Sequence, residues 1–262
     1  EHEYWAYDTT SISSYSESLK QVKYGFNKDH DPLPQINLAL LFGEETGLPF
    51  YYRKLAGNIS DVKTVKNLLA DLANLGFDTV KLVMDRGFYS EDNINALYQN
   101  HLKFLIATKV SLKYVQQELD QVRDSIRTRA NYNSNYQLHC HTTKVDWTYS
   151  QKRPYKGDVI KDKRRMYMHI YYSGEKALEH ETRFNSLLDK LETELVSGNR
   201  NPEHEKQYAK YFEISTTPIR GTKVTPKEKV IAQAEKDYGY FVLISNEIKD
   251  PILALETYRN KD

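Results

Sequence analysis

Apolar residues follow an alternating, strand-like pattern in the first part of the chain. Residues 3–12, 35–42 and 48–55 are short runs rich in aromatic, β-branched and leucine side chains, which favours strands. Residues 44–47 between the last two runs end in glycine and are typical of a hairpin turn. Short connections of this kind predict three antiparallel strands.

The pattern changes to helical spacing after Ser60, which is a suitable N-cap residue. The apolar positions of this predicted helix are Val62, Val65, Leu68, Leu69, Leu72 and Leu75, and Gly76 follows as the C′ residue. A strand at residues 80–84, a helix at 91–99 capped by Ser90 and a strand at 103–108 complete the series. Helical crossovers make these later strands parallel to the first, which predicts an α/β fold with a mixed five-stranded sheet flanked by helices.

A second type of pattern occupies residues 109–236. The predicted elements there are helices at 112–126, 175–195 and 206–211 and strands at 136–143 and 166–172, with a break at 198–202. We interpret this region as an insertion, because a strand like the earlier ones resumes only at 238–245, followed by a helix that begins at Pro251. The predicted division is therefore 1–108 for the first part of the core, 109–236 for the insertion and 237–262 for the return of the core.

Composition limits the class of protein. Of the 262 residues, 39% are hydrophobic and 28% are charged. The sequence contains no run of about 18 apolar residues, so no membrane span is predicted. A single cysteine, Cys140, excludes an intrachain disulfide framework and suits the reducing cytoplasm, where we expect the protein. The net charge of +1 means that any nucleic-acid surface must be a local patch. The chain starts without methionine, and we expect it to be a piece of a longer protein.

Two aspartates stand out as candidate catalytic residues. Asp85 follows the strand at 80–84 and precedes a helix, the position at which α/β sheets place ligand-binding groups. A lone aspartate at such a position is also typical of a turn residue that caps nearby amides. Asp8 lies inside the first strand, where a charge is costly unless it is paired or bound to a cation. If the two strands are neighbours about 4.8 Å apart, both carboxylates could bind one Mg²⁺ ion.

Five motifs follow one another along the chain, at residues 7–10, 56–61, 84–90, 239–246 and 258–262. In their order and spacing they resemble the DDE transposases of bacterial insertion sequences, and the resemblance covers nearly the whole chain. It implies an RNase H-like fold with an insertion after the fifth strand, and DNA cleavage and strand transfer that depend on two Mg²⁺ or Mn²⁺ ions. Asp8 and Asp85 correspond to the first and second catalytic and metal-binding acids.

The resemblance also implies a third acid, a glutamate on the helix after the insertion. Tyr258, Arg259 and Lys261 match the approach to that helix, and we expect the glutamate beyond Asp262. Glu247 and Glu256 lie before this signature and are not assigned the role. The chain by itself would hold two of the three acids, so we expect it to be inactive alone. A homodimer would join two transposon ends.

Candidate DNA contacts come from three segments, and DNA, as transposon ends and as target, is the expected partner. They are Arg86 beside the second acid, then Lys152, Arg153, Lys163, Arg164 and Arg165 in a basic and aromatic part of the insertion, and Tyr258, Arg259 and Lys261. For the basic segment a solvated charged loop is the alternative.

Two other functions share these residues. An RNase H-like nuclease would use the same two acids without strand transfer, and a decayed transposase fragment would at most bind DNA. His139 and His141 share a strand face, but without further ligands surface histidines explain them better than a metal site.

Overall fold

The computed structural model describes residues 3–16, 18–25, 33–43, 45–77, 79–152, 159–217 and 221–261. It divides into two compact units. The first comprises Glu1–Asp124, Cys140–Ile170 and Phe241–Asp262, and the second comprises Ser125–His139 and Tyr171–Tyr240. Each unit is considered by itself below. In the described residues, no helix is both long and apolar enough to cross a membrane.

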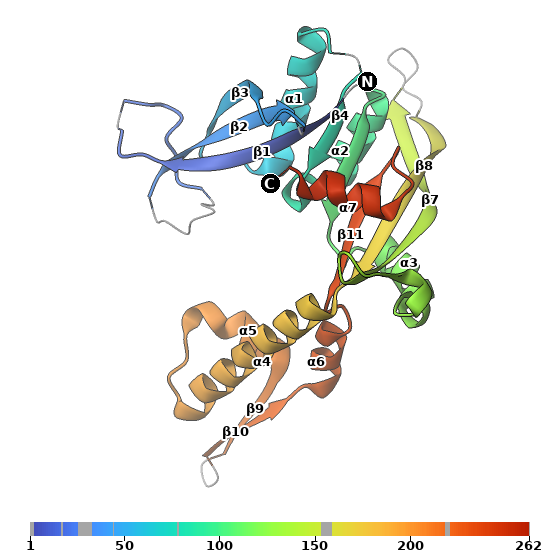
Figure 1. The fold of residues 1–262 in the computed structure, drawn as a ribbon. Coiled ribbons are helices and arrows are strands. Elements are labelled where there is room, and N and C mark those ends of the chain that lie inside the picture. The colour runs from blue at the N-terminus through green and yellow to red at the C-terminus, as the bar shows by residue number, and fades with distance from the viewer. Residues whose placement is uncertain are drawn as a thin grey trace. The chain divides into compact units, whose positions relative to one another are not determined.

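Nine strands form the main sheet in the described residues, in the order β3, β2, β1, β4, β5, β11, β8, β7 and β6 (Figure 1). Their bounds are β1 Tyr4–Ser13, β2 Gln35–Gly43, β3 Pro49–Ala56, β4 Lys81–Met84, β5 Lys103–Thr108, β6 Tyr132–Asn133, β7 Leu138–Lys152, β8 Val159–Tyr172 and β11 Tyr240–Ser245. The sheet is mixed: β1 pairs antiparallel with β2 and parallel with β4, and β4 pairs parallel with β5. The mixed α/β fold and the adjacency of the first and fourth strands are thus confirmed, and the first five strands are consistent with an RNase H-like core.

The sheet is wider than the predicted five strands. β11 pairs antiparallel with β5, and β8 and β7 continue the sheet beyond it. The physical reason is visible in β8, where residues 166–171 are buried without interruption. Such a run suits a central strand that is covered on both faces. Strands that we expected inside the insertion therefore extend the main sheet.

Helices α1 (Asp61–Asn74) and α2 (Glu91–Gln99) are the crossovers that bring β4 and β5 into the sheet. Four of the predicted apolar positions of α1 are fully or nearly buried, namely Val65, Leu68, Leu69 and Leu72. Gly76 follows the helix with φ of 76°, a left-handed conformation that favours glycine. Ser90 caps α2, because its hydroxyl accepts a hydrogen bond of 3.1 Å from the Asn93 amide. Both predicted helices are confirmed, as are the Ser90 cap and the glycine after α1, whereas Ser60 stands at the N-cap of α1 without a side-chain capping hydrogen bond.

A buried histidine joins β8, β7 and the loop after β11 in the first unit. His169 on β8 has no exposed surface, and its Nε2 donates to the carbonyl oxygen of Ile248 at 3.2 Å. Because a carbonyl only accepts, Nδ1 is the nitrogen that accepts from the Thr142 hydroxyl at 2.8 Å. Burial lowers the pKa of His169 to about 4, so the ring is neutral at pH 7.

Two further helices follow strands of the main sheet: α3 comes after β5, and α7 comes after β11. α3 spans Lys113–Ile126 and is followed by the short 3₁₀ helix η2 (Arg129–Asn131). α7 spans Pro251–Arg259, with Pro251 at its first turn and the Asp250 carboxylate accepting from the Leu253 amide at 2.7 Å. Both helices agree with the predicted segments within a residue or two.

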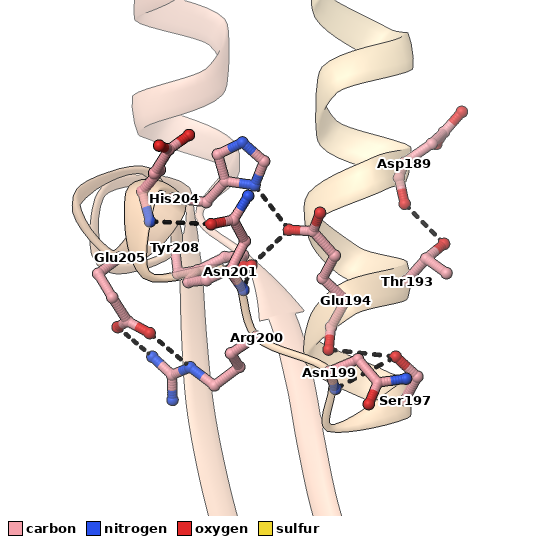
Figure 2. A network of polar contacts seen from close by, with 11 residues as sticks. Asp189, Thr193, Glu194, Ser197, Asn199, Arg200, Asn201, His204, Glu205 and Tyr208 are labelled. Carbon is pink, nitrogen blue, oxygen red and sulfur yellow. Dashed lines mark hydrogen bonds and ion pairs between the residues drawn. The ribbon is translucent and has the colours of Figure 1, made fainter.

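The second unit is built on α4 (Gly174–Ser197), which ends at Gly198 with φ of 74°. Its other elements are η3 (Pro202–His204), α5 (Glu205–Tyr211), α6 (Glu228–Glu235) and a separate two-stranded sheet of β9 (Phe212–Thr217) and β10 (Gly221–Pro226). Its core consists of Leu191, Leu195, Tyr208, Tyr211, Phe212 and Ile231. A polar network fixes α4 to α5: Glu194 accepts from the Tyr208 hydroxyl and from His204 Nδ1, and Arg200 forms a two-point ion pair with Glu205 (Figure 2).

Candidate active site on β1 and after β4

The burial pattern of β1 sets the direction of Asp8. Tyr7 and Thr9 on either side of it are each 3% exposed, whereas Asp8 itself is exposed. Successive side chains of a strand point to opposite faces, so Asp8 points away from the face that contains Tyr7 and Thr9. Burial raises the pKa of Tyr7 to about 12, which keeps this neighbour neutral.

Asp85 lies at the matching position on the neighbouring strand. Tyr7 of β1 is aligned with Met84 of β4, and the two strands are parallel. Asp8 and Asp85 are each one residue beyond that aligned pair. Neighbouring strands lie about 4.8 Å apart, so the two carboxylates reach the same edge of the sheet from adjacent backbones.

The Asp85 side chain does not cap the turn that follows it. Asp85 is the N-cap residue of the 3₁₀ helix η1 (Arg86–Phe88), but its carboxylate makes no capping hydrogen bond. Instead, the Tyr258 hydroxyl donates to Asp85 Oδ1 at 2.5 Å, and Lys261 Nζ lies 3.0 Å from the same oxygen. The turn-capping alternative for Asp85 is therefore wrong, because the carboxylate interacts with residues from the end of the chain.

Tyr258 and Lys261 form one group with each other as well. Lys261 Nζ lies 4.7 Å from the centre of the Tyr258 ring, a cation–π distance, and only 9% of the lysine side chain is exposed. Asp85 keeps 43% of its side chain exposed. The carboxylate is thus oriented by a phenol and an ammonium group while remaining accessible from solvent.

A second interaction group connects β1 with the turn after β4, on the face to which Thr9 points. The Thr9 hydroxyl donates to Asp61 Oδ1 at the start of α1. Asp61 also lies against Gly87: a Cβ atom on Gly87 would be 2.9 Å from Asp61 Oδ2. Thr9 directly follows Asp8, and Gly87 is two residues after Asp85. Asp61 therefore contacts the chain next to both candidate acids, and we call Thr9, Asp61 and Gly87 the clamp.

Asn93 supports the clamp from α2. Its side-chain amide nitrogen donates to the carbonyl oxygens of Val62 and Phe88, both at 2.8 Å, and the residue is 2% exposed. These bonds fix the first turn of α1 against η1. Because buried hydrogen bonds of this kind are costly to break, the turn after Asp85 has little freedom.

A polar cavity of about 260 Å³ lies beside the clamp. Its lining consists of Thr9, Ser11, Asn37, Gly57, Asn58, Ile59, Ser60, Asp61 and Gly87. Asn37 donates from its amide to the carbonyl oxygens of Ile59 at 3.0 Å and Gly57 at 3.4 Å, which fixes the loop before α1. The residues 56–61 that the sequence singles out thus form a wall next to the turn that follows Asp85.

The candidate DNA contacts fall into separate places. Arg86 is exposed next to Asp85, and Arg259 is exposed on the last turn of α7, whereas Tyr258 and Lys261 bind the Asp85 carboxylate. Arg153 lies outside the described residues, as does the side chain of Lys152. Lys163 forms an exposed ion pair of 3.5 Å with Asp146.

Arg164 and Arg165 are not at the edge that carries the acids. They line a cavity with His101 and Lys103, where α2 ends and β5 begins. Because β4 and β5 are parallel, the cavity lies at the amino ends of these strands, whereas Asp85 follows the carboxyl end of β4. Glu247 is also at the amino ends, pairing with Lys81 at 3.3 Å at the start of β4.

The sequence argument missed Asp61 and Asn93. Asp61 has the ordinary signal of an acid in the first turn of a helix, and its position in the 56–61 motif was the only hint of another role. Within the described part of the chain, no three His, Cys, Asp or Glu side chains gather as a metal-binding group, and His139 and His141 take part in none.

A family model described as transposase DDE domain matches residues 5–237, most of the chain and both candidate acids. The chain belongs to the transposase DDE domain family. No curated protein matches it. Membership in this transposase family implies transposase function and binding to DNA. In the transposase domain, the match includes the 56–61 motif, β1 with Asp8 and the turn with Asp85, so the clamp and both acids lie within the family region.

Proposed function

We propose that this domain cleaves DNA at the ends of an insertion sequence and joins those ends to target DNA, using divalent metal ions held by Asp8 and Asp85. The alignment of Tyr7 with Met84 carries the proposal, because it puts the two carboxylates at equivalent positions on adjacent parallel strands. A lone exposed aspartate needs no function, but two acids at adjacent positions on neighbouring strands form a suitable cation site.

The donor set fits Mg²⁺ or Mn²⁺. Carboxylate oxygens are the hard ligands that these ions prefer, and the partial exposure of Asp85 leaves room for water and phosphate oxygens. Asp8 would hold both ions and Asp85 one of them, and the ions would supply positive charge beside the reacting phosphate. Ions bound there would activate a water or a DNA 3′-hydroxyl for in-line attack on a phosphodiester and stabilise the leaving oxygen.

The residues around Asp85 have two roles in this proposal. Tyr258 holds the carboxylate in one orientation through its hydrogen bond to Oδ1. Lys261 and Arg86 place positive charge beside the acid, where a scissile phosphate would lie. The same acids serve cleavage and joining, and only the nucleophile changes. Residues 109–236 as a family insertion, and a homodimer that holds two ends, belong to the same proposal.

The test is a cleavage and strand-transfer assay with the protein. The substrate is a duplex with the terminal sequences of its own element, in Mg²⁺ buffer. Asp8→Asn and Asp85→Asn should each abolish cleavage, while Asp92→Asn serves as the matched control because that side chain is 81% exposed on α2. Cleavage by the Asp85→Asn protein at the control rate would remove Asp85 from the mechanism.

The two alternative functions give different results in the same assay. An RNase H-like nuclease would cut the duplex without joining its 3′ end to target DNA. A fragment that only binds DNA would shift the duplex in a gel with no product in either step. Strand transfer that is lost together with cleavage in both aspartate variants supports the transposase.

A further inference from the structure

The structure has a cavity of about 370 Å³ at the edge of the sheet away from the two acids. It lies where α2 ends and β5 begins, and β8 passes beside it. The lining consists of Tyr98, His101, Leu102, Lys103, Arg164, Arg165 and Asn246. All of these residues belong to the first unit, so the cavity is formed within one compact body.

The charge of this lining has one sign. His101, Lys103, Arg164 and Arg165 are basic, and no lining residue is acidic. Two acids lie nearby: Asp162 forms an exposed, and therefore weak, ion pair of 3.4 Å with Arg164 of the lining, and Glu247 pairs with Lys81 outside the lining. Gathering like charges around a hollow is unfavourable unless an anion is there to be bound.

The walls of the cavity are fixed before any ligand binds. The Tyr98 hydroxyl donates to the carbonyl oxygen of Arg165 at 3.0 Å, which joins α2 to β8. The Asn246 amide donates to the Leu102 carbonyl oxygen at 2.9 Å and accepts from the Phe104 amide at 3.0 Å, so it holds the start of β5. A cavity that is pre-formed loses less conformational entropy when it binds a ligand.

The two arginines are supported by aromatic rings. The Arg164 guanidinium lies 5.4 Å from the centre of the Tyr149 ring, and that of Arg165 lies 5.3 Å from the Tyr167 ring. Stacking of this kind limits the rotamers of a guanidinium while its N–H groups stay available for two-point binding of a phosphate. Both arginines are exposed, as a contact with a macromolecule requires.

His101 occupies an unusual backbone position in this lining. It follows α2 with φ of 55°, the left-handed conformation that favours glycine at the end of a helix. A side chain other than that of glycine is sterically disfavoured in that conformation. The Leu102 amide that donates to the Leu97 carbonyl oxygen closes the helix end and holds the residue there. The chain thus carries an imidazole in the lining of the cavity, at a position where glycine would be less strained.

We propose that this cavity binds the phosphodiester backbone of DNA. The inference rests on the proposed function and deepens it, because it assigns a second DNA contact that is separate from the reacting phosphate. Lys103 of β5 is aligned with Lys81 of β4, and Asp85 lies four residues after Lys81. The cavity and Asp85 are therefore separated by about 13 Å along the strands. One phosphate cannot contact both places, so the cavity holds a flanking part of the duplex.

The test is the salt dependence of DNA binding, measured by fluorescence anisotropy with a labelled duplex in EDTA. The full-length protein with Arg164→Gln and Arg165→Gln is compared with one carrying Lys66→Gln and Lys113→Gln, which removes two exposed cations from α1 and α3. Loss of two phosphate contacts should reduce the slope of log K against log salt by about 2, while the control keeps the wild-type slope. Equal slopes for both double variants would overturn the proposal.

Two further measurements keep the result clear. Thermal unfolding followed by circular dichroism must show that the arginine variant folds as the wild type does. Titration with inorganic phosphate separates a small-anion site from a DNA contact: tight phosphate binding with an unchanged DNA slope also overturns the proposal. Because binding is measured without metal ions, its outcome does not depend on whether Asp8 and Asp85 catalyse cleavage.

Discussion

Gly87→Ala tests whether the clamp holds the end of β4. The added Cβ would lie 2.9 Å from Asp61 Oδ2, so either the carboxylate or the turn must move. A free carboxylate would move at little cost, but Asp61 accepts a hydrogen bond from Thr9. Breaking a hydrogen bond to a charged group costs about 1.5 to 3 kcal/mol, and alanine recovers about 0.4 to 1 kcal/mol by restricting the unfolded chain. We expect Gly87→Ala to lower the free energy of unfolding by about 1 to 2 kcal/mol.

The Thr9→Val variant shows whether the hydrogen bond is the cause. Valine is similar in shape but cannot donate, so it should cost about 1 to 2 kcal/mol by itself. Once Asp61 is released, the Gly87→Ala change should add little further cost, and the double variant should be more stable than the sum of the single effects by about 1 kcal/mol. Gly174→Ala is the matched control, because its added methyl group meets no atom within 4 Å.

The assay is urea unfolding followed by tryptophan fluorescence for the clamp variants and by circular dichroism for the control. Both tryptophans, Trp5 and Trp147, lie in the first unit, so fluorescence follows the unit that contains the clamp. Additive effects of Thr9→Val and Gly87→Ala would show that the close approach of Gly87 to Asp61 does not depend on the hydrogen bond, and the clamp would not connect the two strands.

Three other predictions concern pH and charge. The pKa of His169 is lowered from 6.5 to about 4, so between these pH values the unfolded chain binds more protons than the folded chain. The free energy of unfolding should therefore fall by about 3 kcal/mol as pH drops from 7 to below 4, with about 2 kcal/mol of the loss reached by pH 5. Urea unfolding should show a smaller loss for His169→Gln than for the wild type. The Tyr208 hydroxyl and His204 lower the pKa of Glu194, so this network stabilises the second unit above the ordinary glutamate pKa, and the stabilisation is lost as pH falls through the lowered value. Tyr208→Phe should unfold at a lower temperature than the wild type at pH 7, and its melting temperature should depend less on acid pH. Identical melting curves for the two proteins would contradict the role of the network. Lys261→Gln removes a cation 3.0 Å from Asp85 and should tighten Mn²⁺ binding roughly fivefold, about 1 kcal/mol, in isothermal titration calorimetry; weaker binding would mean that Lys261 helps to form the site.

Local patterns in the sequence were sufficient for the elements that position the acids. The apolar run before Asp85, the glycine after it and the helical stripe after Ser60 each depend on residues close together in the chain. Hairpin and crossover connections predicted that β1 and β4 are parallel, and that a mixed sheet can place them side by side. The neighbouring positions of Asp8 and Asp85 were therefore a conditional prediction, and the strand order β3, β2, β1, β4 confirms that the two strands are neighbours.

The remaining features depend on partners far apart in the chain. Asp61 receives its hydrogen bond from Thr9, which is 52 residues away, and Tyr258 reaches Asp85 across 173 residues. Arg164 and Arg165 looked like part of one basic segment with Lys152 and Lys163, but their cavity is formed by α2 and β5 instead. Periodicity gives the face of an element, whereas the pairing of β11 and β8 with the sheet is decided by packing.

The most direct test of the account is a crystal structure of the protein soaked in Mn²⁺, with an anomalous difference map recorded at the manganese edge. The account predicts at least one Mn²⁺ ion bound by carboxylate oxygens of both Asp8 and Asp85, at about 2.0 to 2.6 Å, the range for hard divalent ions. An occupied manganese site elsewhere with no peak between these two side chains, or two carboxylates that point away from each other, would contradict it.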